Sequence, residues 1–144
     1  MTDKQAAARD WLQRNQWRKD EIRAMRAKLE AMRESVAKVV AVPNDVKVQT
    51  QPGNRSEKAI CEIVDFEKEI DDRARYFQEL DRMTLVTISK LNNAQYVYLL
   101  TSRYLLEKTW KEIAGELHYT ENYCYELHLK ALDNIYTYID FSIK

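Results

Sequence analysis

Apolar residues that recur at seven-residue spacing are the feature that most constrains the fold of this chain. In the middle of the sequence the repeated positions are Ile63, Ile70, Phe77, Thr84 and Leu91, which are apolar except for Thr84. Nearer the N-terminus, alternating steps of three and four connect Ile22, Met25, Leu29, Met32, Val36 and Val39. Each pattern puts a narrow apolar seam along an α-helix. With only two Gly and two Pro among 144 residues, the composition disfavours turn-rich β folds and favours long helices.

The charges of the two seam segments are complementary. Residues 1–42 carry ten Lys and Arg against six Asp and Glu, whereas residues 57–92 carry six against nine. Opposite net charge and similar seam length favour a long antiparallel heptad hairpin within one chain. A parallel or swapped dimer would satisfy the same heptads, so a homodimer through these helices remains an alternative. Asn15 lies seven residues before Ile22 and is a polar seam residue of the kind that sets register.

Both prolines lie between the two predicted helices. Residues 41–56 contain Pro43 and the Pro52-Gly53 pair, so we predict a mobile loop there, with the second helix starting near Ser56.

A second break in the helical pattern occurs at Asn92-Asn93. We therefore predict an all-α fold with two domains, a coiled-coil helical hairpin at 1–92 and a C-terminal domain at 93–144. A third helix is expected from about 93 to 106, ahead of a further helical pair.

The segment 109–132 has the residue spacing of a helix-turn-helix. Small or apolar residues occupy the positions where its two helices must meet: Ile113, Ala114, Leu117, Tyr119, Cys124 and Leu127. Ala114 provides the small residue that a steep crossing of two short helices needs. The turn is placed at His118, a residue type that tolerates positive φ. Thr109 and Thr120 are predicted N-caps of the two helices.

The stretch from 91 to 135 resembles the fourth region of the sigma-seventy family of RNA polymerase sigma factors. The residues that carry the resemblance are Arg103-Tyr104, Glu112-Ile113-Ala114, the helix from Thr120, and Ala131-Leu132. The wider layout of the chain also looks like that of phage ArpU-type, sigma-like late-gene regulators. These proteins have an N-terminal heptad hairpin with a Pro/Gly loop before such a motif. The resemblance implies a sequence-specific, DNA-binding transcription regulator of phage or prophage late genes. Its expected partners are double-stranded DNA and RNA polymerase.

The resemblance also implies which residues contact DNA. Base contacts would come from the start of the second helix, at Glu121, Asn122 and Glu126, with Tyr123 and Tyr125 beside them. Thr120, the N-cap of that helix, is also expected to contact DNA. The family usually has arginines among these positions, and this chain has none. Asn can bond adenine, Glu can accept from cytosine N4, and Tyr can pack on a thymine methyl, although the two tyrosines would equally suit packing on a neighbouring helix. Phosphate contacts are expected from Arg103, Lys108, Lys111 and Lys130.

Other classes of function find little support in the sequence. There is no Gly-rich phosphate loop, nucleophile elbow or catalytic Cys–His pair, so we predict no enzyme activity and no cofactor. His118 and His128 lack further residues at ligand spacing, so no metal site is expected. Cys61 and Cys124 are expected to act as small apolar residues in a reducing compartment. No apolar run approaches about 18 residues, so we expect a cytoplasmic protein of a bacterial host with no membrane association.

Two other functions fit the same features. A phage DNA-packaging small subunit also combines a helix-turn-helix with coiled coil, and would form a ring of many copies. A protein-only adaptor would bind RNA polymerase through an acidic C-terminal domain, since residues 93–144 carry five Lys and Arg against seven Asp and Glu.

Overall fold

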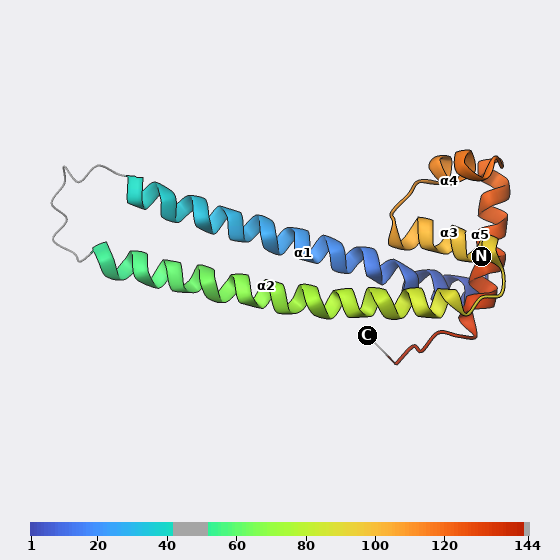
Figure 1. Cartoon of the computed structure of the whole chain (residues 1–144), viewed down its shortest axis with the longest axis horizontal. Helices are drawn as coiled ribbons and strands as arrows, with labels where there is room; N and C mark the ends of the chain where they lie inside the picture. The colour runs from blue at the N-terminus through green and yellow to red at the C-terminus, as the bar shows by residue number, and fades with distance from the viewer. Residues whose placement is uncertain (42–51, 143–144) are drawn as a thin grey trace. The chain divides into compact units, whose positions relative to one another are not determined.

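The computed structural model describes residues 1–41 and 52–142. In those ranges all regular structure is helical, which confirms the predicted all-α class. The elements in chain order are α1 (Asp3–Ala41), α2 (Pro52–Ser89), α3 (Ala94–Leu100), the π-helical η1 (Thr101–Leu105), α4 (Trp110–Leu117) and α5 (Glu121–Tyr136) (Figure 1). Over the same ranges, no helix has the length and apolar character needed to cross a bilayer.

The chain packs as two compact units, and α1 and α2 contribute to both. Unit 1 comprises residues 1–19 and 77–144, and unit 2 comprises residues 20–76. The division therefore falls inside the two long helices. The physical reason is that the first turns of α1 and the last turns of α2 bury their apolar residues against α3, η1 and α5.

Unit 2 is held by apolar contacts between α1 and α2. Leu29, Ile63 and Ile70 are buried at its centre. Ile22, Met25, Met32, Val36 and Phe66 pack around them and are partly buried. Val39 was predicted on the same seam but is 61% exposed. The buried seam of α1 therefore ends at Val36.

Two ion pairs join α1 and α2 in unit 2 and show how the segments are aligned. Arg33 of α1 pairs with Glu67 of α2, and Glu21 pairs with Arg73 at 2.6 Å. A residue later in α1 thus pairs with one earlier in α2, so the two segments run antiparallel. These pairs are exposed to solvent and each contributes less than about 1 kcal/mol.

α2 begins at Pro52, before the start near Ser56 that the sequence predicted. Proline suits the first turn of a helix, because the N–H that it lacks has no partner within the helix there. The first part of α2 therefore lies in what was predicted as loop, and residues 42–51 of that loop lie outside the described residues.

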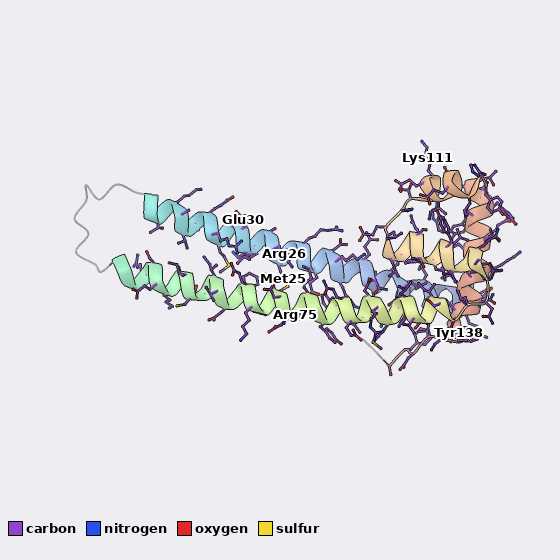
Figure 2. The ribbon with its side chains drawn as sticks, in the orientation of Figure 1. Met25, Arg26, Glu30, Arg75, Lys111 and Tyr138 are labelled. Atoms are coloured by element: carbon purple, nitrogen blue, oxygen red, sulfur yellow. The ribbon has the colours of Figure 1, made fainter. Side chains whose placement is uncertain are left out.

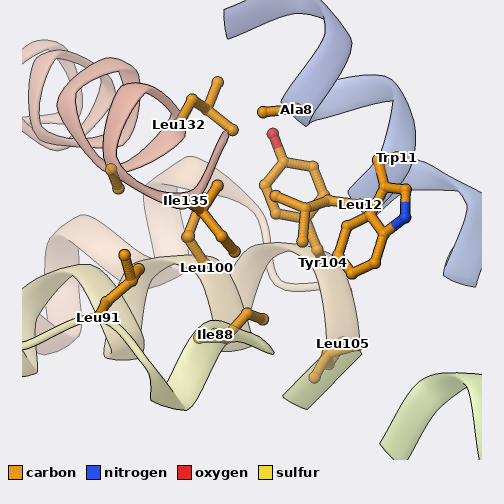
Figure 3. Packing of buried hydrophobic residues seen from close by; sticks show 11 residues of the cluster. Ala8, Trp11, Leu12, Ile88, Leu91, Leu100, Tyr104, Leu105, Leu132 and Ile135 are labelled. Carbon is orange, nitrogen blue, oxygen red and sulfur yellow. The ribbon is translucent and has the colours of Figure 1, made fainter. Parts of the chain in front are cut away.

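Unit 1 has a core to which α1, α2, α3, η1 and α5 all contribute (Figure 3). Its buried members are Ala8, Trp11, Leu12, Ile88, Leu91, Leu100, Tyr104, Leu105, Ala131, Leu132 and Ile135. Complete burial of a side chain such as Leu12 or Ile135 stabilises the fold by roughly 2 kcal/mol. This core anchors α5, so it positions the side chains that α5 presents to solvent.

The polar residue Asn15 is buried between α1 and α2 in unit 1, as its seam position predicted, together with Thr84 of α2. Its Nδ2 donates to the Leu12 carbonyl at 3.0 Å, and its Oδ1 accepts from the Thr84 hydroxyl at 3.1 Å. Arg18 donates to the same Oδ1 at 3.2 Å. The buried amide is therefore satisfied at both of its ends.

The single helix predicted from 93 to 106 forms as two segments. Asn93 caps α3 by accepting from the Gln95 and Tyr96 amides. Beyond Leu100 the backbone widens into η1, which ends with the Leu106 amide donating to the Thr101 carbonyl at 3.0 Å. The wider turn lets the consecutive residues Tyr104 and Leu105 both enter the core.

Candidate nucleic-acid interface on α4 and α5

α4 packs against α5 through the residues that their spacing placed inward. Ile113 and Ala114 of α4 are buried together with Cys124 and Leu127 of α5, and Leu99 of α3 completes the cluster. Ala114 supplies the small side chain that lets two short helices approach closely. Burial raises the pKa of the Cys124 thiol, which keeps it a neutral, apolar-like residue in this cluster. Cys61, in contrast, is exposed, so its expected role as a packed apolar residue is wrong.

The turn between α4 and α5 is made by His118. Its backbone is left-handed, with φ 59° and ψ 37°, and its N–H caps α4 by donating to the Ala114 carbonyl. The Tyr119 amide donates to the same carbonyl at 3.0 Å. Histidine is one of the non-glycine residues that tolerate this conformation, so the predicted placement of the turn is confirmed.

Both predicted N-caps are present. The Thr109 hydroxyl accepts from the Glu112 amide at 3.2 Å at the start of α4. The Thr120 hydroxyl accepts from the Tyr123 amide at 3.1 Å at the start of α5. Each cap stabilises its helix by about 1 kcal/mol, which matters for α4 because it has only eight residues.

Tyr119 does not fill the space between the helices, contrary to the prediction. Its side chain is 37% exposed, and its hydroxyl accepts from Gln95 Nε2 at 2.7 Å. Its ring meets the Tyr123 ring edge-on, with centroids 4.9 Å apart. Leu99 occupies the interior of the cluster instead, and Tyr119 lies at the surface in contact with Gln95 of α3 and Tyr123 of α5.

The first two turns of α5 present the predicted base-contacting side chains to solvent. The exposed residues are Thr120, Glu121, Asn122, Tyr123, Tyr125 and Glu126. Within the described ranges, the side chains of Glu121, Asn122 and Glu126 have no hydrogen bond or ion pair. These three polar groups are therefore available for contacts with another molecule.

The two tyrosines of this surface are each held on one side. The Tyr125 ring packs edge-on against Trp110 of α4 at 5.8 Å and lies 5.4 Å from the His128 ring. Tyr123 packs on Tyr119. Both tyrosines still expose about two-fifths of their surface, so packing and outward contact are compatible in this structure.

The predicted phosphate-contacting cations divide into two pairs. Arg103 lies over the Trp110 ring at 4.8 Å and donates to the Lys108 carbonyl at 3.1 Å, and the Lys108 ammonium pairs with Glu116 at 2.8 Å. Lys111 and Lys130 are exposed, and no ion pair to either occurs among the described residues. Figure 2 shows Lys111 projecting outward from α4. Lys111 and Lys130 are therefore the cations best able to meet an external anion.

Sequence reasoning gave no role to His128, which lies buried beneath this surface. It is 2% exposed, its Nε2 is hydrogen-bonded to the Tyr104 hydroxyl, and its ring lies 4.7 Å from Trp110. Its Nδ1 has no hydrogen-bond partner in the described part of the chain. The burial of His128 could have been predicted from its spacing to Cys124 and Leu127, because residues 124, 127 and 128 share one helical face.

The surroundings of His128 determine its charge. Burial, together with the positive charges of Arg103 and Arg9, lowers its pKa to about 4. Burial raises the pKa of the Tyr104 hydroxyl above its ordinary value. The pair is therefore neutral at neutral pH, and it connects α5 to η1 as an uncharged hydrogen bond.

Comparison with protein-family models, with curated proteins and with solved structures found no match. In the described ranges, no three His, Cys, Asp or Glu side chains are placed to hold a metal ion. A function therefore has to be inferred from the residues themselves.

Proposed function

We propose that the chain is a sequence-specific DNA-binding transcription regulator. In this proposal α4 and α5 form a sigma-like helix-turn-helix, and α5 enters the major groove of duplex DNA. The observation that carries it is the contrast between the two faces of α5. The inner face is packed on α4, whereas polar side chains at the start of the outer face are exposed and unpaired within the described ranges. Helix-turn-helix proteins read base edges with such a supported N-terminal stretch.

The exposed side chains supply the chemistry of base recognition. Asn122 can donate to and accept from the major-groove edge of adenine, and Glu121 or Glu126 can accept from the cytosine N4 amine. Tyr125 presents an aromatic edge to a thymine methyl group. Lys111, Lys130 and the amide groups at the starts of α4 and α5 would contact phosphates.

The resemblance of residues 91–135 to sigma region four supports a role at phage or prophage late genes, with RNA polymerase as a second partner. In the same proposal, α1 and α2 form an antiparallel heptad hairpin that precedes this DNA-binding domain. A homodimer would present two such domains, and bivalent binding would compensate for the small number of cations on each.

A mobility-shift assay with fragments of the source genome tests the proposal at low and near-physiological salt. We expect the purified chain to shift one or a few fragments. Asn122→Ala should abolish the shift or weaken it roughly 5- to 150-fold, because a good base contact contributes about 1–3 kcal/mol. Lys111→Ala should weaken binding to all fragments alike, because it removes a phosphate contact. Asn134→Ala is the matched control, since it makes the same change at an exposed residue near the other end of α5. No shift at either salt would overturn direct DNA reading.

One observation favours a second candidate, the protein-only adaptor. The exposed surface of α4 and α5 carries Glu112, Glu121 and Glu126, while Lys108 is paired with Glu116. A negative surface of this kind disfavours phosphate contacts. The adaptor predicts nuclease-resistant binding to purified RNA polymerase that Asn122→Ala and Lys111→Ala leave intact, together with no mobility shift.

A further inference from the structure

Unit 1 contains a half-open groove of 290 Å³ formed by α1, α2 and the segment that follows α5. Its apolar lining includes Trp11, Leu80 and Met83, and its basic lining consists of Arg18, Arg82 and Lys90. The candidate DNA-contacting residues of α4 and α5 do not line it. What the groove binds is therefore a separate question from what α5 binds.

Two exposed hydrophobic side chains extend the apolar lining to the surface. Val86 of α2 is 47% exposed, and Tyr138, which follows α5, is similarly exposed. Both line the groove, and Figure 2 shows Tyr138 beside the C-terminal part of α2. An apolar floor with a polar rim is the usual composition of a protein-binding site.

The rim is positively charged. Three cations line the groove against a single carboxylate, that of Asp140. This carboxylate already accepts from the Ser142 amide at 3.0 Å and from the Ser142 hydroxyl. Arg82 is paired with Glu79 on the same helix and Arg18 donates to Asn15 Oδ1, whereas Lys90 has no ion pair among the described residues. The groove therefore complements an anionic partner.

We propose that this groove binds an acidic amphipathic peptide segment of a partner protein. Aliphatic or aromatic side chains of the peptide would pack on Trp11, Met83 and Val86, and its carboxylates would meet Lys90 and the guanidinium groups of the rim. A DNA backbone offers phosphates but no apolar side chains, so it would leave the apolar floor uncovered. The open form and the position along one face of α2 suit a peptide laid into a groove.

Selection from a displayed library of random peptides tests this inference on the full chain. We expect enriched peptides to combine Asp or Glu with aliphatic or aromatic residues. Their affinity in solution, measured by fluorescence anisotropy, should fall with added salt. Val86→Asp and Lys90→Glu should each weaken binding at least about tenfold, as expected where an apolar or charged contact at an interface is lost.

Leu85→Asp is the matched control. Leu85 neighbours Val86 on α2 and is 43% exposed, but it does not line the groove. The same apolar-to-acidic change at this position should leave peptide affinity unaltered. Circular dichroism and urea unfolding of both variants would establish that each remains folded.

Several results would overturn the inference. They are the absence of any enriched peptide, enrichment of basic peptides, equal binding by the Val86→Asp chain, and displacement of bound peptide by duplex DNA. A change of mass in sedimentation caused by Val86→Asp alone would also overturn it, because a second copy would then be the occupant. None of these readouts depends on the mobility shift, so the groove and the proposed DNA-binding surface can fail separately.

Discussion

At position 128 a histidine lies on the inner face of α5, where neighbouring positions are apolar and buried. A buried imidazole is tolerated because Tyr104 satisfies Nε2 and because the ring stays neutral. Both conditions depend on residues distant in sequence. Protonation of His128 at low pH would therefore destabilise the fold around it.

We expect the chain to lose stability as the pH falls from about 6.5 to 4. The folded-state pKa of His128 is about 4, below the ordinary value of about 6.5. The unfolded state consequently binds the extra proton in this window, and stability rises with pH through it. The contribution of neutral His128 to the free energy of unfolding is fully present above about pH 6.5. Roughly 3 kcal/mol of it is lost when the pH has fallen to the folded-state pKa.

Urea unfolding of the wild-type chain and of His128→Phe across this range measures the effect. The variant should lack this part of the pH dependence, whereas Tyr104→Phe should retain it, because the imidazole is still present. Equal pH slopes in the wild-type chain and His128→Phe would show that other groups dominate.

Gly115 provides a second prediction at this scale. It lies inside α4, its φ is not positive, and an added Cβ would meet no atom within 4 Å. Gly115→Ala should raise the free energy of unfolding by roughly 0.5–1 kcal/mol, because alanine loses less conformational entropy in a helix. Urea unfolding measures the change, with Ala114→Gly as the buried neighbouring control that should destabilise. If the Gly115→Ala chain were less stable than the wild-type chain, the added methyl group could not be entering open space.

At the scale of elements, buried polar contacts connect α1 to its neighbours in unit 1. Asn15 bonds Thr84 of α2, and Gln5 donates to the Leu129 carbonyl and the Asp133 carboxylate of α5. Such contacts require one alignment of the helices, whereas apolar contacts tolerate sliding.

A double-mutant cycle tests the Asn15–Thr84 contact. Asn15→Leu should cost about 1–2 kcal/mol, because Arg18 loses an acceptor and the Thr84 hydroxyl keeps only the Leu80 carbonyl, at 2.9 Å. Thr84→Val should cost less in the Asn15→Leu chain than in the wild-type chain, with a coupling energy of about 1 kcal/mol. Urea unfolding of the four chains supplies the energies. Strictly additive costs would mean that the hydrogen bond does not stabilise the pairing.

For the whole molecule, the charge balance limits how the chain can bind DNA. It carries 23 Lys and Arg against 23 Asp and Glu. Of the four cations predicted to contact phosphates, Arg103 and Lys108 are engaged within the protein. Few counterions would therefore be released when DNA binds.

If α5 reads DNA as proposed, the salt dependence of affinity should be shallow. We expect the logarithm of the binding constant to fall with log salt at a slope of roughly −2 to −4, because each neutralised phosphate contributes about −0.9. Lys111→Ala should make the slope less negative by about 0.9. Fluorescence anisotropy on the fragment found by mobility shift measures both. A slope steeper than about −6 would require more phosphate contacts than α4 and α5 provide.

Local features of this fold were predictable from the sequence. The seam periodicity predicted the long helices, threonine hydroxyls predicted the caps of α4 and α5, and residue type placed the turn at His118. Each of these features depends on interactions between residues within about one or two helical turns. Exposure of Asn122 on α5 likewise followed from its position after the N-cap.

Features that depend on distant contacts were decided by the tertiary structure. Leu99 rather than Tyr119 filled the interior of its cluster, η1 replaced part of a regular helix, and Trp110 and Glu116 engaged Arg103 and Lys108. The groove lined by Trp11, Met83 and Tyr138 joins three segments that no local pattern relates. The sequence by itself determined the helical class, where α4 and α5 are capped and turn, and which face the long helices bury. Which side chains remain available for a partner was decided only by packing, because burial and ion pairing depend on residues that folding brings together.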